Sequence, residues 1–233
     1  MPLATVDTSV ALPATLSARS HPRKLFVMLA FGALTYRAEH LRLDADALRH
    51  AAASEGGELA GLAALDHMIE QAERRRSALA ELLPYDAPDD WVAAGFSALF
   101  DEYGRKLIER GHRLDPSVRD EDVPRLRRQF EAICVCGPPP FDPEGVPTLT
   151  RDPQDDPIVY GALLAGSDFL ISDDRDIVPS GEEHEYEHEE HRLRAVTFGH
   201  FANTCFAGGD FAWSEVDGAW LRLAWEPHDD RGA

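Results

Sequence analysis

RDPQDDPIVYGALLAGSDFLISDDRDIV, residues 151–178, is an apolar segment with aspartates gathered at both of its ends. Its centre predicts a helix from about Pro157 to Ala165, followed by a short strand, DFLIS, at 168–172. Carboxylates that converge in space raise one another's pKa values or recruit a cation. The stretch therefore predicts a helix–strand unit with a charged cluster beside it. The aspartates are Asp152, Asp155, Asp156, Asp168, Asp173, Asp174 and Asp176.

Strands and helices alternate along the rest of the chain. This alternation predicts an α/β fold with a mostly parallel sheet. Ligands of such sheets bind beyond the carboxyl ends of the strands. Asp7 and Asp174 each lie at or just after a short strand-like run, so we expect both at one edge of the sheet. The predicted strand-like runs are 4–12, 90–96, 133–137, 168–172 and 194–198, and further helices are predicted at 97–111 and 121–133.

Two long helical patterns, 21–53 and 59–83, indicate a helical hairpin. Gly56 and Gly57 separate them, and Pro84 ends the second. We expect this hairpin to be inserted into the α/β domain at about residues 33–88.

The C-terminal third contains two further segments. The tail 208–227 alternates around Asp217-Gly218, which is typical of a β-hairpin and carries three tryptophans. The charged segment 179–193 is predicted to be a solvated loop, although on a helix its histidines at 184, 188 and 191 would share a face and could bind a transition metal. The expected organisation is one domain over 1–207 and an extension over 208–233.

Composition excludes several classes of protein. The chain has 233 residues, 44% of them apolar, enough to bury a core in one large domain. A net charge of −19 argues against a strong non-specific nucleic-acid clamp, yet it allows a metal-dependent nuclease, because divalent ions supply the charge that phosphates meet. No apolar run has the length of a membrane span, and the N-terminus lacks a secretory signal's basic region. Cys134 and Cys136, two apart on a predicted strand, indicate reduced thiols in the cytoplasm rather than a zinc site.

Single aspartates have ordinary explanations. Asp156 precedes a proline at a helix start and fits an N-cap, and Asp174 fits a turn residue. Asp7 is harder to explain, because a carboxylate in an apolar run is costly unless it is partnered or ends the strand. Together, acids at one sheet edge with no His or Cys nearby favour Mg²⁺ or Mn²⁺, and such ions can activate water for phosphodiester cleavage.

The segment from Asp152 to Val178 closely resembles the C-terminal motif of PIN-domain ribonucleases, especially the toxin components of that family. In this motif one Asp opens a helix and a second Asp follows an apolar strand. Asp156 and Asp174 fall on those two positions, and Asp176 matches an additional Asp two residues later.

Two N-terminal segments extend the resemblance. TVDTSVAL, residues 5–12, resembles the family's opening strand and gives Asp7 as the first acid. WVAAGFSALFDEYGRKL, residues 91–107, resembles the segment that carries the second acid, which makes Glu102 the match and Asp101 the fallback. Glu102 follows Asp7 by 95 residues, far more than in short family members, and the inserted hairpin accounts for the difference.

The resemblance implies a three-layer α/β/α sandwich with a central, mostly parallel sheet. It also implies a cytoplasmic, Mg²⁺- or Mn²⁺-dependent endoribonuclease that uses no protein nucleophile. Its partners would be an RNA substrate and, as the toxin of a toxin–antitoxin pair, an antitoxin protein; homodimers are common in the family, and no membrane is involved. The metal and the attacking water would be held by Asp7, Glu102, Asp156 and Asp174, with Asp176 as a further ligand and with Ser9 and Ser172 as hydrogen-bond partners.

A second function stays open, namely a catalytically silent PIN-like module that binds or regulates through its helical hairpin. The acidic charge, the insertion and the Trp-rich tail favour it. A phosphatase of the haloacid-dehalogenase type is disfavoured, because it needs a second Asp where this chain has Ser9. Metal binding separates the nuclease from the module.

Overall fold

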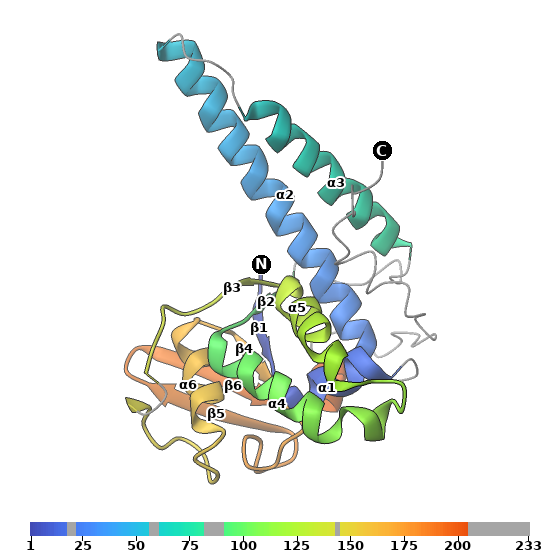
Figure 1. Ribbon diagram of the computed structural model, residues 1–233. Helices are drawn as coiled ribbons and strands as arrows, with labels where there is room; N and C mark the ends of the chain where they lie inside the picture. Colours follow the sequence, from blue (N-terminus) through green and yellow to red (C-terminus); the bar gives the residue numbers. More distant parts are fainter. Residues whose placement is uncertain (18–21, 56–60, 82–90, 143–144, 205–233) are drawn as a thin grey trace.

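The computed structural model describes residues 1–17, 22–55, 61–81, 91–142 and 145–204. These residues form an α/β fold around a six-stranded sheet in the order β3-β2-β1-β4-β6-β5 (Figure 1). All neighbouring strands run parallel except β5 and β6, which confirms the predicted mostly parallel sheet. The strands are β1 (Leu3–Val6), β2 (Val92–Ala94), β3 (Cys134–Cys136), β4 (Phe169–Ile171), β5 (Glu183–His188) and β6 (His191–Val196).

Strand β1 lies in the middle of the sheet between β2 and β4. Thr5 is in register with Ala94 on one side and with Leu170 on the other. The residues of β1 are small or β-branched, and Ala4, Thr5 and Val6 are almost fully buried. Burial on both faces explains why this strand is apolar along its length instead of alternating with polar residues.

The helices cover the sheet in an arrangement compatible with a three-layer α/β/α fold. Helices α1, α2, α4 and α5 pack against one another, and α6 packs against β4, β5 and β6. The apolar faces of these helices and the strands form one core that includes Phe26, Tyr103, Phe130 and Phe201. The helix bounds are α1 (Thr8–Leu16), α2 (Pro22–Glu55), α3 (Leu62–Ala80), α4 (Ser97–Leu114), α5 (Val123–Ile133), α6 (Asp156–Leu164) and α7 (Phe198–Thr204), with a 3₁₀ turn at Asp120–Asp122.

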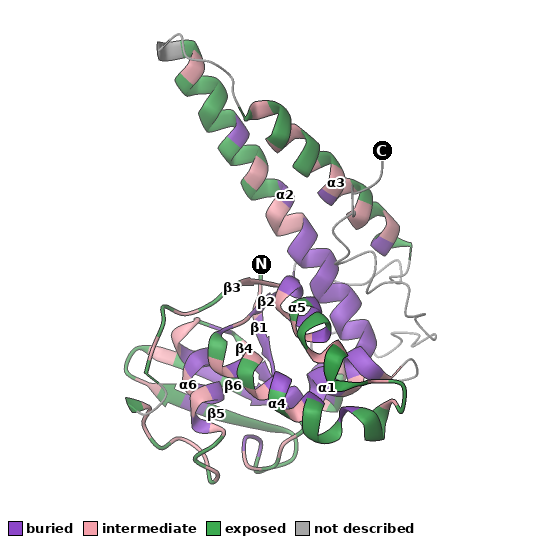
Figure 2. Ribbon diagram, viewed as in Figure 1, coloured by how far each residue is buried: buried purple, intermediate pink, exposed green. Residues whose placement is uncertain are grey.

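Helix α2 joins the core to a projecting helical hairpin. Its 34 residues span about 50 Å. The first half is buried in the domain core, and the second half leaves the domain and pairs with α3 (Figures 1 and 2). The predicted helical hairpin is therefore present, but no break occurs near residue 33, because its first arm continues a core helix. Ion pairs Arg49–Asp66 and Arg42–Glu73 cross between the two arms.

Two segments differ from the predictions. Residues 8–12, predicted as part of a strand-like run, form the start of α1, since the chain turns at Asp7. The charged segment 179–193, predicted as a loop, contains β5 and the first half of β6. Only Tyr186 of β5 is buried, so this edge strand has no apolar alternation to reveal it. His184 and His188 lie on an extended strand, which makes the helical arrangement of the three histidines wrong.

The structure also bears on the predictions for the cysteines and for membrane spans. Cys134 and Cys136 are free thiols on the edge strand β3 and form no bond to each other. The predicted hairpin at 208–227 and the extension at 208–233 lie outside the described residues. Among the helices that the structure describes, none has the length and apolar character needed to cross a membrane.

Gly32 lies where α2 crosses the chain just before β2. A Cβ atom at Gly32 would lie 1.7 Å from the backbone carbonyl oxygen of Trp91. We expect Gly32→Ala to lower the free energy of unfolding by about 1–3 kcal/mol, because overpacking would force the two backbones apart. Urea denaturation measures this loss.

The matched control is Gly104→Ala, where a Cβ atom in α4 would meet nothing within 4 Å. This substitution should raise stability by up to about 1 kcal/mol, because alanine is the better helix former. Similar effects of the two substitutions would contradict the close approach at Gly32.

Candidate metal centre

Asp7 stands at the carboxyl end of β1 and caps α1. Its backbone N–H donates to the Ile171 carbonyl of β4 at 2.9 Å, which continues the parallel pairing one residue beyond the strand. Its Oδ2 accepts hydrogen bonds from Ser9 N at 3.1 Å, Ser9 Oγ at 2.6 Å and Ser172 Oγ at 2.8 Å. Asp7 is only 3% exposed, and a buried carboxylate needs such hydrogen-bond donors in place of water. The hydrogen bonds expected of Ser9 and Ser172 are present.

Glu102, in the second turn of α4, lies beside Asp7. The Thr8 hydroxyl is 3.3 Å from Asp7 Oδ1 and 3.3 Å from Glu102 Oε1, so it bridges the two acids. The Glu102 side chain is only 12% exposed, and its Oε2 is buried without a hydrogen-bond partner. Burial and the charge of Asp7 raise the Glu102 pKa to about 7, although Lys106, Arg105 and Thr8 act in the opposite direction.

Asp155 faces the same acids from α6. It is the N-cap residue of α6, but its side chain caps no backbone N–H. Burial raises its pKa to about 7, and the charges of Asp174, Asp7, Glu102 and Asp152 add to the shift. Acids from the ends of β1 and β4, from α4 and from the start of α6 therefore act on one another.

Asp156, the next residue, binds the loop that precedes α6. It is 5% exposed, and its Oδ1 accepts hydrogen bonds from Leu149 N at 2.9 Å, Thr150 N at 2.7 Å and Thr150 Oγ1 at 2.8 Å. These contacts tie the preceding loop to α6. Asp155 is the aspartate at the start of α6 on which the charges of Asp174, Asp7 and Glu102 act.

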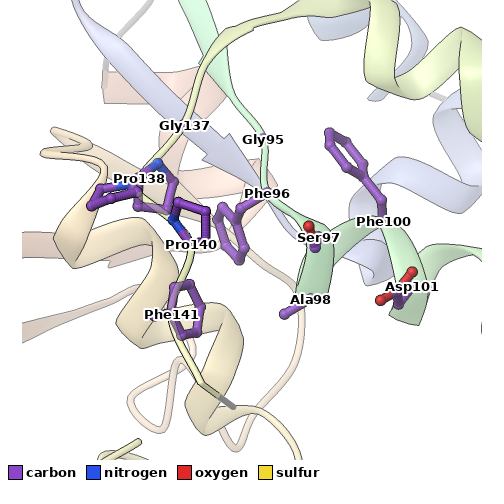
Figure 3. A pocket seen from close by; sticks show the side chains of 11 residues that line it. Gly95, Phe96, Ser97, Ala98, Phe100, Asp101, Gly137, Pro138, Pro140 and Phe141 are labelled. Carbon is purple, nitrogen blue, oxygen red and sulfur yellow. The ribbon is translucent and has the colours of Figure 1, made fainter.

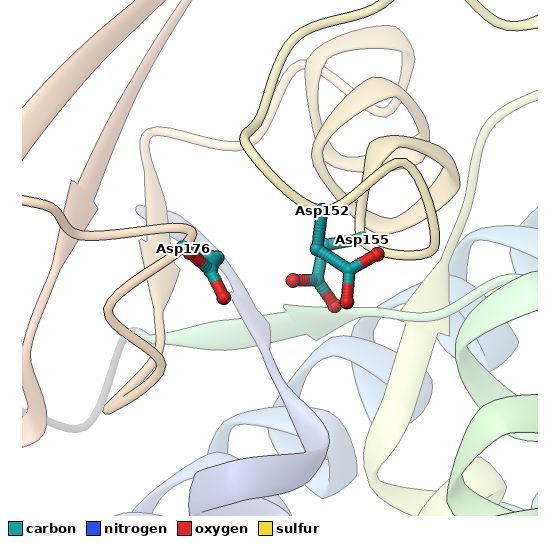
Figure 4. A group of neighbouring side chains, drawn as sticks. All are labelled: Asp152, Asp155 and Asp176. Atoms are coloured by element: carbon teal, nitrogen blue, oxygen red, sulfur yellow. The ribbon is translucent and has the colours of Figure 1, made fainter.

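A further group of acids lies at this edge. Asp152, Asp155 and Asp176 each place a carboxylate oxygen within 4.8 Å of the others (Figure 4). Asp152 and Asp155 come from the turn before α6, and Asp176 approaches from the turn after β4, where Asp174 Oδ1 accepts the Asp176 N–H at 2.9 Å. Asp176 was expected to belong to this site. Asp152 was not expected there, although its closeness to Asp155 in the sequence could have indicated it.

The donor set suits a hard divalent cation. Oxygen atoms of carboxylates are the ligands that Mg²⁺, Mn²⁺ and Ca²⁺ prefer, and the group contains no His or Cys. The partnerless Oε2 of Glu102 and the mutual repulsion of the acids both fit a site in which a cation would satisfy the charge. No protein-family model, curated protein or solved structure matches the chain. The geometry of the acids and the sequence motifs are therefore the basis for assigning a function.

The raised pKa values predict how metal-free stability depends on pH. Glu102 and Asp155 bind protons more tightly in the folded than in the unfolded chain, so their contribution is complete below about pH 4 and is lost as the pH rises through about 7. We expect the Tm of the metal-free protein to fall between about pH 5 and pH 8. A bound divalent ion should reverse this fall at pH 8. Differential scanning fluorimetry with and without Mn²⁺ measures both effects.

Glu102→Gln isolates one of the two groups, because glutamine keeps the shape and cannot ionise. Its Tm should depend less steeply on pH than that of the unmodified chain and should rise less with Mn²⁺. Glu121→Gln, at a residue whose side chain is 77% exposed, is the control and should keep the full slope. A Glu102→Gln protein that follows the unmodified Tm at every pH would contradict the assignment.

Proposed function

We propose that this protein is a PIN-like endoribonuclease that hydrolyses RNA phosphodiester bonds with Mg²⁺ or Mn²⁺. The proposed ligands are Asp7, Glu102, Asp155 and Asp174, with Asp152 and Asp176 beside them. The observation that carries the proposal is the convergence of acids from four separate chain segments, in which Glu102 retains a buried oxygen without a partner. Acids that merely solvate a surface have no need of such convergence.

The fold and the motifs support the same reading. Asp7 and Asp174 follow adjacent parallel strands, β1 and β4, at the edge where α/β sheets bind ligands. The three segments that resemble PIN-domain motifs supply these residues and Glu102. The preference for RNA, the toxin role, the antitoxin partner and the cytoplasmic location rest on that resemblance.

The chain's own residues would hold the reacting groups in place. Ser9 and Ser172 donate hydrogen bonds to Oδ2 of Asp7 and so orient its Oδ1. Lys106 Nζ lies 3.6 Å and Arg105 Nη2 lies 3.8 Å from Glu102 Oε1, so both cations can orient this carboxylate and attract a phosphate. When bound, the divalent ion would lower the pKa of a water molecule and polarise the phosphate.

The silent-module alternative keeps one specific observation in its favour. The α2–α3 hairpin projects from the domain, and its outer residues include the exposed Leu43, Leu48 and Met68. A partner could bind this arm whether or not the acids work in catalysis. Titration of the purified chain with Mn²⁺ in a calorimeter separates the two functions, because a silent module without a metal site would give no heat at millimolar metal.

The proposal predicts metal-dependent cleavage of RNA. Asp7→Asn and Asp155→Asn should each reduce the rate by about 100-fold or more, since each removes a charge from the site. Asp156→Asn is the matched control, because asparagine still offers an oxygen to the loop donors that Asp156 binds. Gel-based cleavage of a labelled RNA, with excess EDTA as a blank, gives the rates.

Two results would contradict the proposal. Cleavage that persists undiminished in Asp7→Asn would place the activity outside this site. A loss in Asp156→Asn together with full activity in Asp155→Asn, in variants of equal Tm, would return the ligand role to Asp156.

A further inference from the structure

A pocket of about 440 Å³ lies at the start of α4, the helix that carries Glu102 (Figure 3). Its walls come from the segments that follow β2 and β3, and both strands end at the same edge of the sheet as β1 and β4. The volume lies within the range of about 300–1,000 Å³ that is usual for small-ligand sites. The lining residues are Gly95, Phe96, Ser97, Ala98, Phe100, Asp101 and 137–141.

The walls of this pocket are aromatic and rigid. Phe96 and Phe141 have ring centroids 6.2 Å apart, and Phe100 lies on the opposite side, next to Asp101 (Figure 3). Phe100 and Phe141 are only partly buried, so part of each ring is open to a ligand. Three successive prolines, Pro138–Pro140, form the other wall and have restricted backbone angles.

Two helices tie the pocket to the acids. Helix α4 begins in the pocket wall at Ser97 and carries Glu102 five residues later. Helix α6 has Asp155 at its N-cap. Gly161 of α6 lies against the Phe96 ring, because a Cβ atom at this position would be 2.4 Å from the ring. Tyr160 packs edge-on to Phe141, with their ring centroids 5.4 Å apart. The distance between pocket and acids is therefore fixed by regular structure.

One acid, Asp101, lines the pocket and is paired with an arginine. Arg127 Nη1 lies 2.8 Å from Asp101 Oδ1, and its Nε lies 2.7 Å from Glu131 Oε1, so Arg127 offsets part of the charge of Asp101. An aromatic, partly open pocket, on a helix that also carries an acid of the proposed metal centre, matches a flat, uncharged ring attached to an anionic strand.

We propose that this pocket binds one unpaired nucleobase of the RNA, stacked on Phe141, close to the phosphate that is cleaved. The proposal rests on the proposed nuclease function and adds that the substrate is single-stranded at this position, because a paired base cannot leave its helix to enter the pocket without losing its pairing. Stacking on an aromatic ring tolerates different bases, so the pocket selects for an unpaired strand more than for a sequence.

The test uses a single-stranded RNA hexamer with the fluorescent base 2-aminopurine at each position in turn. Binding is measured with the full chain carrying Asp7→Asn, which should slow cleavage by about 100-fold or more. At one position the fluorescence should fall on binding, because the base stacks on a ring. Adding Phe141→Ala should weaken that binding about tenfold and abolish the fall, whereas Phe141→Tyr should keep both. The same hexamer annealed to its complement should give no change in fluorescence.

Cleavage kinetics with Asp7 intact supply the second readout. Phe141→Ala should raise KM about tenfold with little change in kcat, and Ala98→Leu, which fills the pocket from the α4 side, should do the same. Equal Tm values exclude unfolding as the cause.

The outcomes separate the two proposals. Metal-dependent cleavage with no fluorescence change at any position, or with a change that Phe141→Ala leaves intact, overturns the pocket assignment and leaves the nuclease standing. Binding that depends on Phe141 without any cleavage supports the pocket as a nucleotide site and overturns the nuclease. Duplex RNA that binds with the same dependence on Phe141 overturns the requirement for an unpaired base.

Discussion

The parallel pairing of β1 with β4 is the constraint on which the rest of the site depends. It places the residue after each strand at one edge, so that Asp7 receives a hydrogen bond from Ser172 and lies near the turn that carries Asp174 and Asp176. Helices α4 and α6 then direct Glu102 and Asp155 to the same edge. Burial, together with the like charges of neighbouring acids, raises the pKa values of Glu102 and Asp155, so these acids oppose folding when they are ionised. Serine and backbone donors offset this repulsion at Asp7, and a divalent cation would offset the remainder.

Much of the fold could be predicted because its elements carry local signals. The buried central strands have continuous apolar runs, and α5 has strongly one-sided polarity. Two elements were predicted wrongly, and each error has a physical reason. The edge strand β5 buries one side chain, so its pairing with β6 is decided by that neighbour and not by its own pattern. The start of α1 is made of Thr, Ser and Val, which suit a strand equally well, and only the cap at Asp7 makes the chain turn there.

The candidate site was predictable in the same uneven way. Asp7, Glu102 and Asp174 follow from the order of strands and helices and from the motifs around them. The choice between Asp155 and Asp156 does not, because adjacent residues at a helix start point about 100° apart and either can face inward. In the structure the donors of Leu149 and Thr150 bind Asp156, and the charges of the other acids act on Asp155. That information lies in the path of the preceding loop, which no helical pattern encodes.

Helix α4 sets the distance between the aromatic pocket and Glu102. Its first residues form one wall of the aromatic pocket, and Glu102 lies five residues after Ser97, about 7.5 Å along the axis. A base in the pocket and a phosphate at the acids would therefore be positioned by a single rigid element, whose inner face is held by Leu99, Tyr103 and Leu107 in the core. Helix α2 packs into the same core before it leaves the domain, so the projecting hairpin can carry its own contacts without disturbing the spacing between pocket and acids.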